Sequence, residues 1–203
     1  MNFPGPSLAR RALMAAAVIG LMASQALAPA RAGDEPRVKF ATSAGDFVVE
    51  LYPDKAPKTV ANFLQYVKDK HYDGTIFHRV INNFMIQGGG YDVHYAEKPT
   101  RPPIVHEGRE AIFRGGPRNV VGTLAMARTN DPNSATAQFF INVRDNAFLD
   151  PSAQSPGYTV FGKVVSGMDV INKIKATPTG PGGPFPGDVP KTPVIINSAT
   201  LVK

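Results

Sequence analysis

Residues 77–89 read FHRVINNFMIQGG, and this stretch predicts two short β-strands separated by a turn. Apolar and β-branched residues favour strands on either side of Asn82-Asn83, a pair that tolerates turn geometry. Because side chains alternate across a strand, Met85 and Gln87 must share one face, while Phe84 and Ile86 point the other way. One face of the second strand therefore combines an apolar group with an amide.

The same combination recurs at residues 137–141, which read AQFFI. Gln138 and Phe140 share a face there, by the same alternation. Two strands of this kind can build one pocket that is partly apolar and partly hydrogen-bonding. The sequence therefore predicts a binding site between them.

The rest of the chain predicts further short strands and two helices. A hairpin is expected over 38–51, where Ser-Ala-Gly-Asp separates two β-prone runs, and helical spacing of apolar residues predicts a helix over 57–68. A second helix is expected at 168–174. The expected further strands are 75–81, 84–88, 123–126, 139–143, 159–165 and 194–202.

Two segments lack clear periodicity. Residues 178–193 are so rich in proline and glycine that we expect a loop, and residues 92–118 read as long loops with one strand. Many short strands, two helices and no internal repeat suggest a closed barrel with helical caps, in which the sheet has no exposed edges.

The N-terminus has the pattern of a signal peptide. Arg10 and Arg11 precede an apolar run over 12–27, which is too short and alanine-rich for a comfortable membrane span. Ala30-Arg31-Ala32 supplies the small residues that signal peptidase needs, so we expect cleavage after Ala32. The arginine pair fits an ordinary positive n-region, with twin-arginine export as the alternative.

An earlier cleavage site at Ala26-Leu27-Ala28 is less suitable, because it would leave Pro29 as the next residue. We therefore divide the chain into a signal peptide at 1–32 and one mature domain at 33–203. The mature protein is expected in the periplasm, with no stable membrane insertion.

Composition excludes several function classes. The signal contributes three arginines and no acid, so of the net charge of +6 only +3 remains on 33–203, too little to argue for nucleic acid. The chain has no cysteine, and its histidines lack metal-ligand spacing. Ser134 and Ser152 lack the G-x-S-x-G elbow of a nucleophile, which argues against a hydrolase. We expect neither a metal nor a cofactor.

Four segments, taken together, resemble the signature segments of cyclophilins. They are 77–89, 122–127 (GTLAMA), 137–141 and 160–164 (VFGKV), which occur in family order and span nearly the whole mature chain. The signal peptide and the short 150–157 loop are most similar to the bacterial periplasmic members. The resemblance implies a mainly β fold, a closed eight-stranded antiparallel barrel capped by two α-helices, and peptidyl-prolyl cis-trans isomerase activity without a cofactor.

The resemblance also implies roles for individual residues. Arg79 matches the catalytic arginine, and His78 beside it is expected to face the opposite side of the strand, as a structural histidine. The matches to the proline pocket are Phe84, Met85, Phe140 and Leu149. The matches to the peptide groove are Gln87, Ala127, Arg128, Thr129, Gln138, Phe148 and Tyr158.

Three of these positions depart from the common family pattern. Phe148 stands where many eukaryotic members carry a tryptophan that helps to bind cyclosporin. Arg128 replaces an asparagine whose backbone grips the substrate, so the grip can survive while the groove becomes more positive. Tyr158 stands where a histidine is common, which keeps an aromatic wall and changes its polar tip.

The expected substrates are proline-containing unfolded or partly folded polypeptides, on which a monomer assists the folding of exported proteins. The alternative is a proline-peptide-binding module or holdase chaperone that uses the same groove without turnover. Retention of Arg79, Phe84, Gln87 and Phe140 favours the enzyme.

Overall fold

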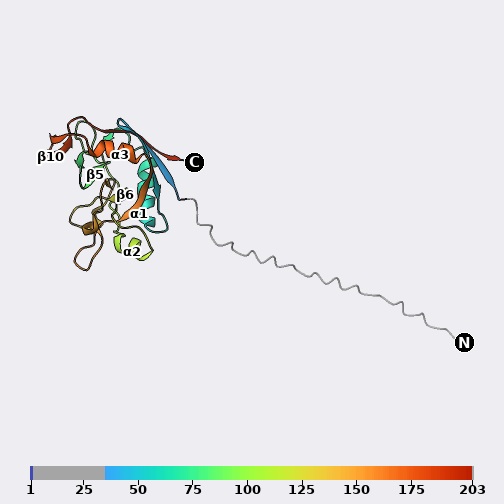
Figure 1. The fold of residues 1–203 in the computed structure, drawn as a ribbon. Helices are drawn as coiled ribbons and strands as arrows, with labels where there is room; N and C mark the ends of the chain where they lie inside the picture. The colour runs from blue at the N-terminus through green and yellow to red at the C-terminus, as the bar shows by residue number, and fades with distance from the viewer. Residues whose placement is uncertain (2–34, 203) are drawn as a thin grey trace. The chain divides into compact units, whose positions relative to one another are not determined.

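The computed structural model describes Met1 and residues 35–202, so the signal peptide expected at 1–32 lies, except for Met1, outside the described residues (Figure 1). Residues 35–202 are mainly β, as expected. The strands are β1 (Arg37–Thr42), β2 (Gly45–Leu51), β3 (Thr75–Ile76), β4 (Arg79–Ile81), β5 (Met85–Gly88), β6 (Thr123–Met126), β7 (Phe139–Asn142), β8 (Val160–Ser166), β9 (Thr179–Gly182), β10 (Phe185–Pro190) and β11 (Ile195–Val202). The helices are α1 (Pro57–Lys68), α2 (Gly108–Phe113) and α3 (Met168–Lys175), with single 3-10 turns at Pro132–Ser134 and Ala147–Leu149.

The main sheet is antiparallel and curls back on itself. Its nine strands follow the order β3-β11-β1-β2-β8-β6-β7-β5-β4. The two edge strands, β3 and β4, are separated in the chain only by Phe77 and His78, so the edges of the sheet are brought together. The single strand expected at 75–81 is therefore interrupted, and counting β3 and β4 as one makes the sheet compatible with the expected eight-stranded barrel.

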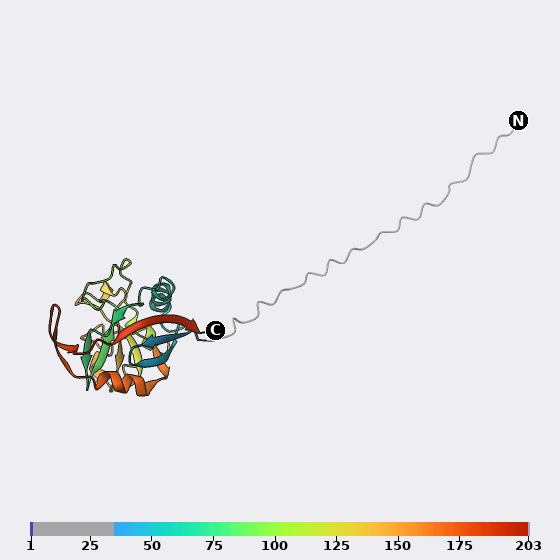
Figure 2. The ribbon, with the colours of Figure 1, turned by 90° about the horizontal axis from the view of Figure 1, so that it is seen from above.

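Two helices flank the curled sheet, as the sequence predicted. The bounds of α1 are those expected, because Pro57 is acceptable in a first turn and Val60, Phe63 and Val67 share a buried face. Helix α3 is one residue longer than expected. Seen from above, α1 (cyan) and α3 (orange) lie on opposite sides of the sheet (Figure 2).

The expectation of loops with one strand over 92–118 was wrong at α2. This helix has only six residues, too few to show a helical period in the sequence, and it buries Gly108 and Ala111. Tertiary packing therefore stabilises a helix that local propensity does not predict.

The expected loop at 178–193 was also wrong, because β9 and β10 form a two-stranded hairpin there. Gly183 turns the chain with a φ of 52°, and the register is irregular between Phe185 and Val189. A two-stranded ribbon has only edge strands, so each proline can lie where no backbone donor is needed. Burial of Val189 fixes the hairpin to the rest of the domain.

The barrel interior is an aromatic core. Phe63 of α1 lies 5.1 Å from Phe161 and 5.2 Å from Tyr72, between ring centroids, and Phe40 stacks on Phe47 at 4.9 Å. A smaller apolar cluster of Met85, Ala125, Phe140, Leu149 and Val160 is separate from it. Both β6 and β7 are buried along their whole length, so these strands carry apolar side chains on two faces.

Helix α1 is capped by a residue far away in the sequence. Its N-cap, Ala56, has no side chain that could accept a hydrogen bond. The buried Glu107 carboxylate accepts instead from Lys58 N (3.2 Å), Thr59 N (2.8 Å) and Thr59 Oγ1 (2.7 Å). A carboxylate at this end also complements the helix dipole, so Glu107 joins α1 to the start of α2.

The histidines His71, His78 and His106 are shielded from solvent, and burial lowers the pKa of each. For His78, burial and then the neighbouring Arg79 cation lower the pKa from 6.5 to about 4. The unfolded chain therefore binds a proton more tightly than the folded one. The resulting stability is complete above pH 6.5 and is lost as pH falls toward 4.

We predict that Glu107→Ala lowers the free energy of unfolding by about 2–4 kcal/mol, because two buried donors of Thr59 lose their acceptor. Urea unfolding followed by circular dichroism measures this. Glu110→Ala is the matched control, since Glu110 is an exposed acid on α2 and its loss should change little. Equal stability of the two variants would contradict the capping role.

We predict that His78→Gln flattens the pH dependence of stability. Between pH 7 and pH 4.5 the parent should lose about 2–3 kcal/mol more than the variant, because only the parent must keep this imidazole neutral. Urea unfolding at the two pH values measures the difference. His94→Gln, which removes an exposed histidine, should behave as the parent does.

Candidate active site

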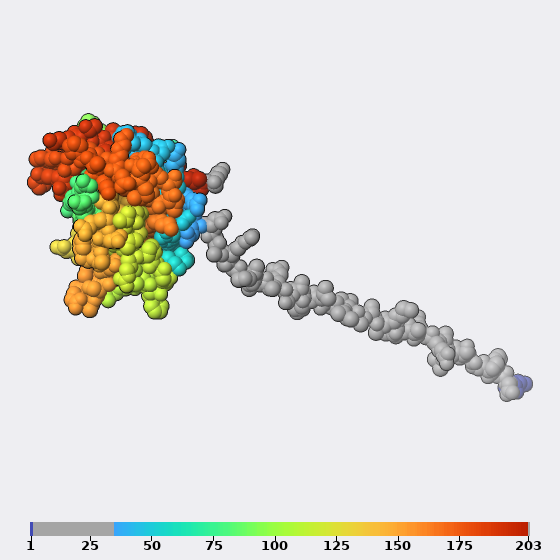
Figure 3. All heavy atoms as spheres, in the orientation of Figure 1, coloured from blue at the N-terminus to red at the C-terminus, as the bar shows by residue number. Residues whose placement is uncertain are grey.

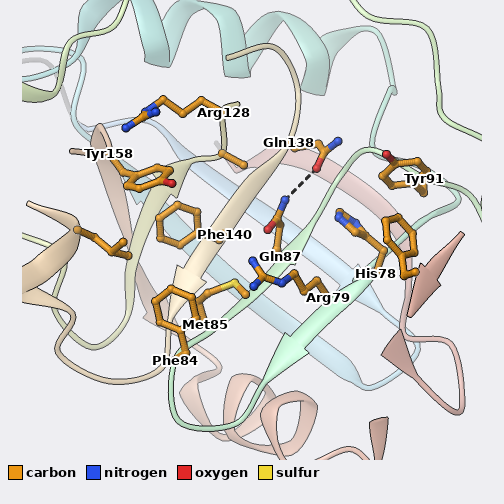
Figure 4. Close-up of a pocket in the computed structure, with 13 residues that line it drawn as sticks. His78, Arg79, Phe84, Met85, Gln87, Tyr91, Arg128, Gln138, Phe140 and Tyr158 are labelled. Carbon is orange, nitrogen blue, oxygen red and sulfur yellow. Dashed lines mark hydrogen bonds between the residues drawn. The ribbon is translucent and has the colours of Figure 1, made fainter. Parts of the chain in front are cut away.

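The small apolar cluster opens into a surface pocket of about 330 Å³ (Figure 4). Strands β4, β5, β6 and β7 form its floor. Its lining residues are His78, Arg79, Phe84, Met85, Gln87, Tyr91, Ala127, Arg128, Gln138, Phe140, Leu149, Tyr158 and Phe185. The pocket thus has an apolar end and a polar end, as the two sequence segments predicted.

The strand register explains why these residues meet. Arg79 pairs with Gln87 across β4 and β5, Gln87 pairs with Phe140 across β5 and β7, and Phe140 pairs with Ala125 of β6. Directly opposed residues in an antiparallel sheet place their side chains on the same face. Arginine, amide and phenyl ring therefore stand side by side in one row.

At the polar end, two amides are joined. Gln87 Nε2 donates to Gln138 Oε1 at 3.0 Å, which fixes both side chains toward the pocket. Gly90 lies against this pair, and a Cβ there would come within 2.6 Å of the Gln138 side chain. A glycine is therefore required at position 90 for Gln138 to occupy this place.

The apolar end is held from behind by buried amides. Asn146 Nδ2 donates to the Phe84 carbonyl at 2.9 Å and to Asn142 Oδ1 at 2.7 Å. Phe84 lies in the turn before β5, so strand alternation does not apply to it and its ring can reach the pocket, while Ile86 faces the barrel interior. Leu149 closes the same end from the 3-10 turn at Ala147–Leu149.

Arg128 is fixed along the rim. Its guanidinium donates to Gly157 O at 2.9 and 3.1 Å and to Thr129 O at 2.8 Å. It also lies 4.5 Å from the centroid of the Tyr158 ring, and that ring packs edge-on against Phe140 at 5.5 Å. The guanidinium of Arg128 is thus occupied by contacts within the protein, including a cation–π contact with the Tyr158 ring, and these contacts stabilise the rim of the groove.

Arg79 is held less tightly. Its side chain is 46% exposed, and within residues 35–202 its one ion pair is a contact of 3.8 Å from Nε to Asp188 Oδ2. Figure 4 shows the guanidinium extending toward Gln87 and Met85, beside the apolar end. A cation that remains free to donate therefore borders a slot of apolar side chains.

Ten of the twelve site residues predicted from the sequence line this one pocket. Thr129 lines a neighbouring hollow that shares Gln87, Arg128 and Gln138. Phe148 is 71% exposed and stacks on Phe84 at 5.6 Å, so it widens the apolar end from outside.

The sequence reasoning missed His78, Tyr91 and Phe185. Because His78 precedes β4, strand alternation does not hold it on the side opposite Arg79; it lines the same pocket, and its Nδ1 atom has no hydrogen-bond partner. Its ring lies 4.8 Å from Tyr91 and 5.4 Å from Phe185. Phe185 belongs to the hairpin expected as a loop, so no local signal identified it.

Among residues 35–202, no group of three or more histidine, aspartate or glutamate side chains is arranged to hold a metal ion. No helix in the same range is both long enough and apolar enough to cross a membrane.

Comparisons with known proteins identify the family. Residues 37–201 match the family described as cyclophilin type peptidyl-prolyl cis-trans isomerase. The chain is 53% identical to peptidyl-prolyl cis-trans isomerase B of Escherichia coli over 81% of this chain and 98% of that protein. It is 47% identical to peptidyl-prolyl cis-trans isomerase A of Dickeya dadantii over 93% of this chain and 96% of that protein.

A solved structure is similar as well. The crystal structure of a cyclophilin type peptidyl-prolyl cis-trans isomerase from Cryptosporidium parvum has a TM-score of 0.66 and 25% identity, and it covers 83% of this chain and 98% of that one. The two proteins therefore share their fold over most of both chains. An arginine beside an apolar slot, on this fold and with these relatives, places the chain in the cyclophilin family, and it is a peptidyl-prolyl cis-trans isomerase.

Proposed function

We propose that Arg79 is the residue that accelerates rotation about the peptide bond before proline. Phe84, Met85, Phe140 and Leu149 hold the proline ring in the apolar slot. The observation that carries this proposal is the position of the Arg79 guanidinium, which borders that slot and is half exposed.

The physics of the peptide bond explains how an arginine can lower the barrier to rotation. Rotation costs about 18–20 kcal/mol because the nitrogen lone pair is delocalised into the carbonyl group. In the twisted state the lone pair is localised on the proline nitrogen and can accept a hydrogen bond from Arg79. That interaction is nearly absent in the planar ground state, so it lowers the barrier.

Arginine needs no tuned acidity for this task, because it stays charged at physiological pH. Burial lowers the pKa of His78, which lines the pocket, and of His106, whose Nε2 lies 3.2 Å from Gly157 O beside Arg128. Both shifts disfavour the charged imidazole. A mechanism by electrostatic stabilisation fits such a site better than proton transfer.

The hydrogen bond from Arg79 accounts for only part of the lowering of the activation barrier. An acceleration of about five factors of ten requires roughly 7 kcal/mol, whereas one charge-assisted hydrogen bond contributes about 1.5–3 kcal/mol. Orientation of the substrate supplies the remainder. The substrate residues on either side of the proline would be held by groups that border the groove, namely Gln87, Gln138 and the backbone of Ala127, Arg128 and Thr129.

We predict that Arg79→Ala lowers kcat/KM by at least about 100-fold, a loss of roughly 3 kcal/mol of transition-state stabilisation, because the apolar slot alone cannot donate to nitrogen. Exchange-spectroscopy NMR on a proline peptide, with enzyme far below stoichiometry, measures turnover. Chemical-shift titration of the same peptide should show that binding weakens much less.

The control is Arg37→Ala, which removes an exposed arginine of β1 that is paired with Glu50. It should leave turnover unchanged, and circular dichroism should show that both variants melt as the parent does. Parent-level turnover in Arg79→Ala would overturn the assignment. Peptide binding by the parent without accelerated exchange would favour the binding-module alternative.

We further propose that the enzyme works in the periplasm as a monomer, on unfolded or partly folded exported polypeptides. The signal pattern at 1–32 supports export, and the match to the Dickeya dadantii protein extends into this segment, since it covers 93% of the chain. Cleavage after Ala32 would leave β1, which begins at Arg37, complete. A monomer would suffice for this task, because one chain supplies all the residues that line the pocket.

We predict that mass spectrometry of the protein from the periplasmic fraction finds Gly33 as its first residue. Ala32→Phe should block that cleavage, because signal peptidase requires a small residue there. The control is Lys203→Ala, a substitution far from the cleavage site in the sequence, which should leave cleavage unchanged. Intact Met1 in the parent protein, or its retention in the cytoplasm, would contradict export.

A further inference from the structure

The hairpin of β9 and β10 contributes a second hollow to the active site. This hollow, of about 340 Å³, is lined by His78, Arg79 and the four residues Phe185, Pro186, Gly187 and Asp188. His78, Arg79 and Phe185 also line the proline pocket, so the two hollows adjoin. Arg79 stands on the boundary between them.

Aromatic packing holds the hairpin in this place. Phe185 stacks on His78 at 5.4 Å and lies 5.1 Å from Tyr91 and 6.3 Å from Tyr95, between centroids. Gly182 lets the hairpin approach closely, since a Cβ there would come within 2.6 Å of the Tyr95 hydroxyl. In the space-filling view the red hairpin borders the green segment that contains β4 and β5 (Figure 3).

The hairpin also aims a carboxylate at Arg79. Asp188 has a φ of 63°, a left-handed conformation that aspartate and asparagine tolerate better than most residues. Its Oδ2 atom lies 3.8 Å from Nε of Arg79, and the two side chains are 49% and 46% exposed. The contact is made through Nε, which leaves the two terminal amino groups of the guanidinium for other partners.

We propose that Asp188 is a positioning residue for Arg79. By attracting the Nε edge, it restricts the rotamers of a half-exposed arginine and presents the terminal amino groups to the proline nitrogen. The inference rests on the proposed catalytic role of Arg79. An exposed ion pair of this kind adds little to folding stability. The main effect of the pair between Asp188 and Arg79 is therefore on catalysis, and the hairpin contributes to catalysis by supplying Asp188.

The first test is Asp188→Asn, which removes the charge while keeping the shape and the tolerance of positive φ. We expect kcat/KM to fall by about threefold to fivefold through kcat, the effect of one exposed ion pair, with an unchanged melting temperature. The matched control is Asp46→Asn, which breaks the pair of Lys39 and Asp46, of similar exposure, on β1 and β2. It should leave turnover unchanged.

NMR of the Arg79 Nε–Hε group reports positioning directly. Asp188→Asn should lower its order parameter and shift its resonance, and Phe185→Ala should do the same because it removes the hairpin's anchor. An unchanged Nε signal in Asp188→Asn would overturn the proposal. Faster turnover in that variant would overturn it too, because the carboxylate would then only weaken the cation.

A double-mutant cycle separates this inference from the one on which it rests. In the Arg79→Ala background, Asp188→Asn should cause no further loss; the same threefold to fivefold loss there would show that Asp188 acts without Arg79 and overturn the proposal. Full activity of Arg79→Ala alone would instead overturn the catalytic assignment, while the Nε signal would still show whether Asp188 holds the arginine.

Discussion

Burial of β5, β6 and β7 on both faces is the constraint from which the site follows. One face of these strands must complete the barrel core, so Ile86, Leu124, Phe139 and Ile141 face inward. The alternate residues of the same strands then face outward and form the pocket, with Met85, Ala125 and Phe140 at its base. A one-residue slip in register would exchange the two sets, so the core and the active site specify each other.

The outer face can be apolar without causing aggregation because it is recessed. Tyr158 with its stacked Arg128 stands on one side, and Phe84 and Phe148 stand on another. Arg79 and Gln87 bound the apolar surface on a further side (Figure 4). The groove therefore presents a narrow apolar slot for a small ring rather than a large exposed hydrophobic patch.

Local sequence predicted much of this arrangement. Helix α1 and strand β6 were expected with their observed bounds, because amphipathic spacing and a β-prone run are signals within one segment. The shared face of Met85 with Gln87, and that of Gln138 with Phe140, followed from alternation alone. The roles of Arg79 and Leu149 came from family resemblance. Local sequence could not predict the hairpin of β9 and β10 or the placement of His78, because both depend on packing against Tyr91 and Tyr95. Helix α2 could not be predicted either, because it packs against β8, about 50 residues further along the chain.

The pairing of the first strand with the last has a consequence for how the protein is made. Arg37 of β1 lies opposite Val202 of β11, so the sheet lacks one of its central pairings until β11 has been synthesised. On the ribosome, the edge of β1 that pairs with β11 therefore stays open until β11 has emerged. This isomerase catalyses a step in the folding of other proteins, yet its own fold is complete only after β11 has left the ribosome. Until then the incomplete chain must avoid aggregation.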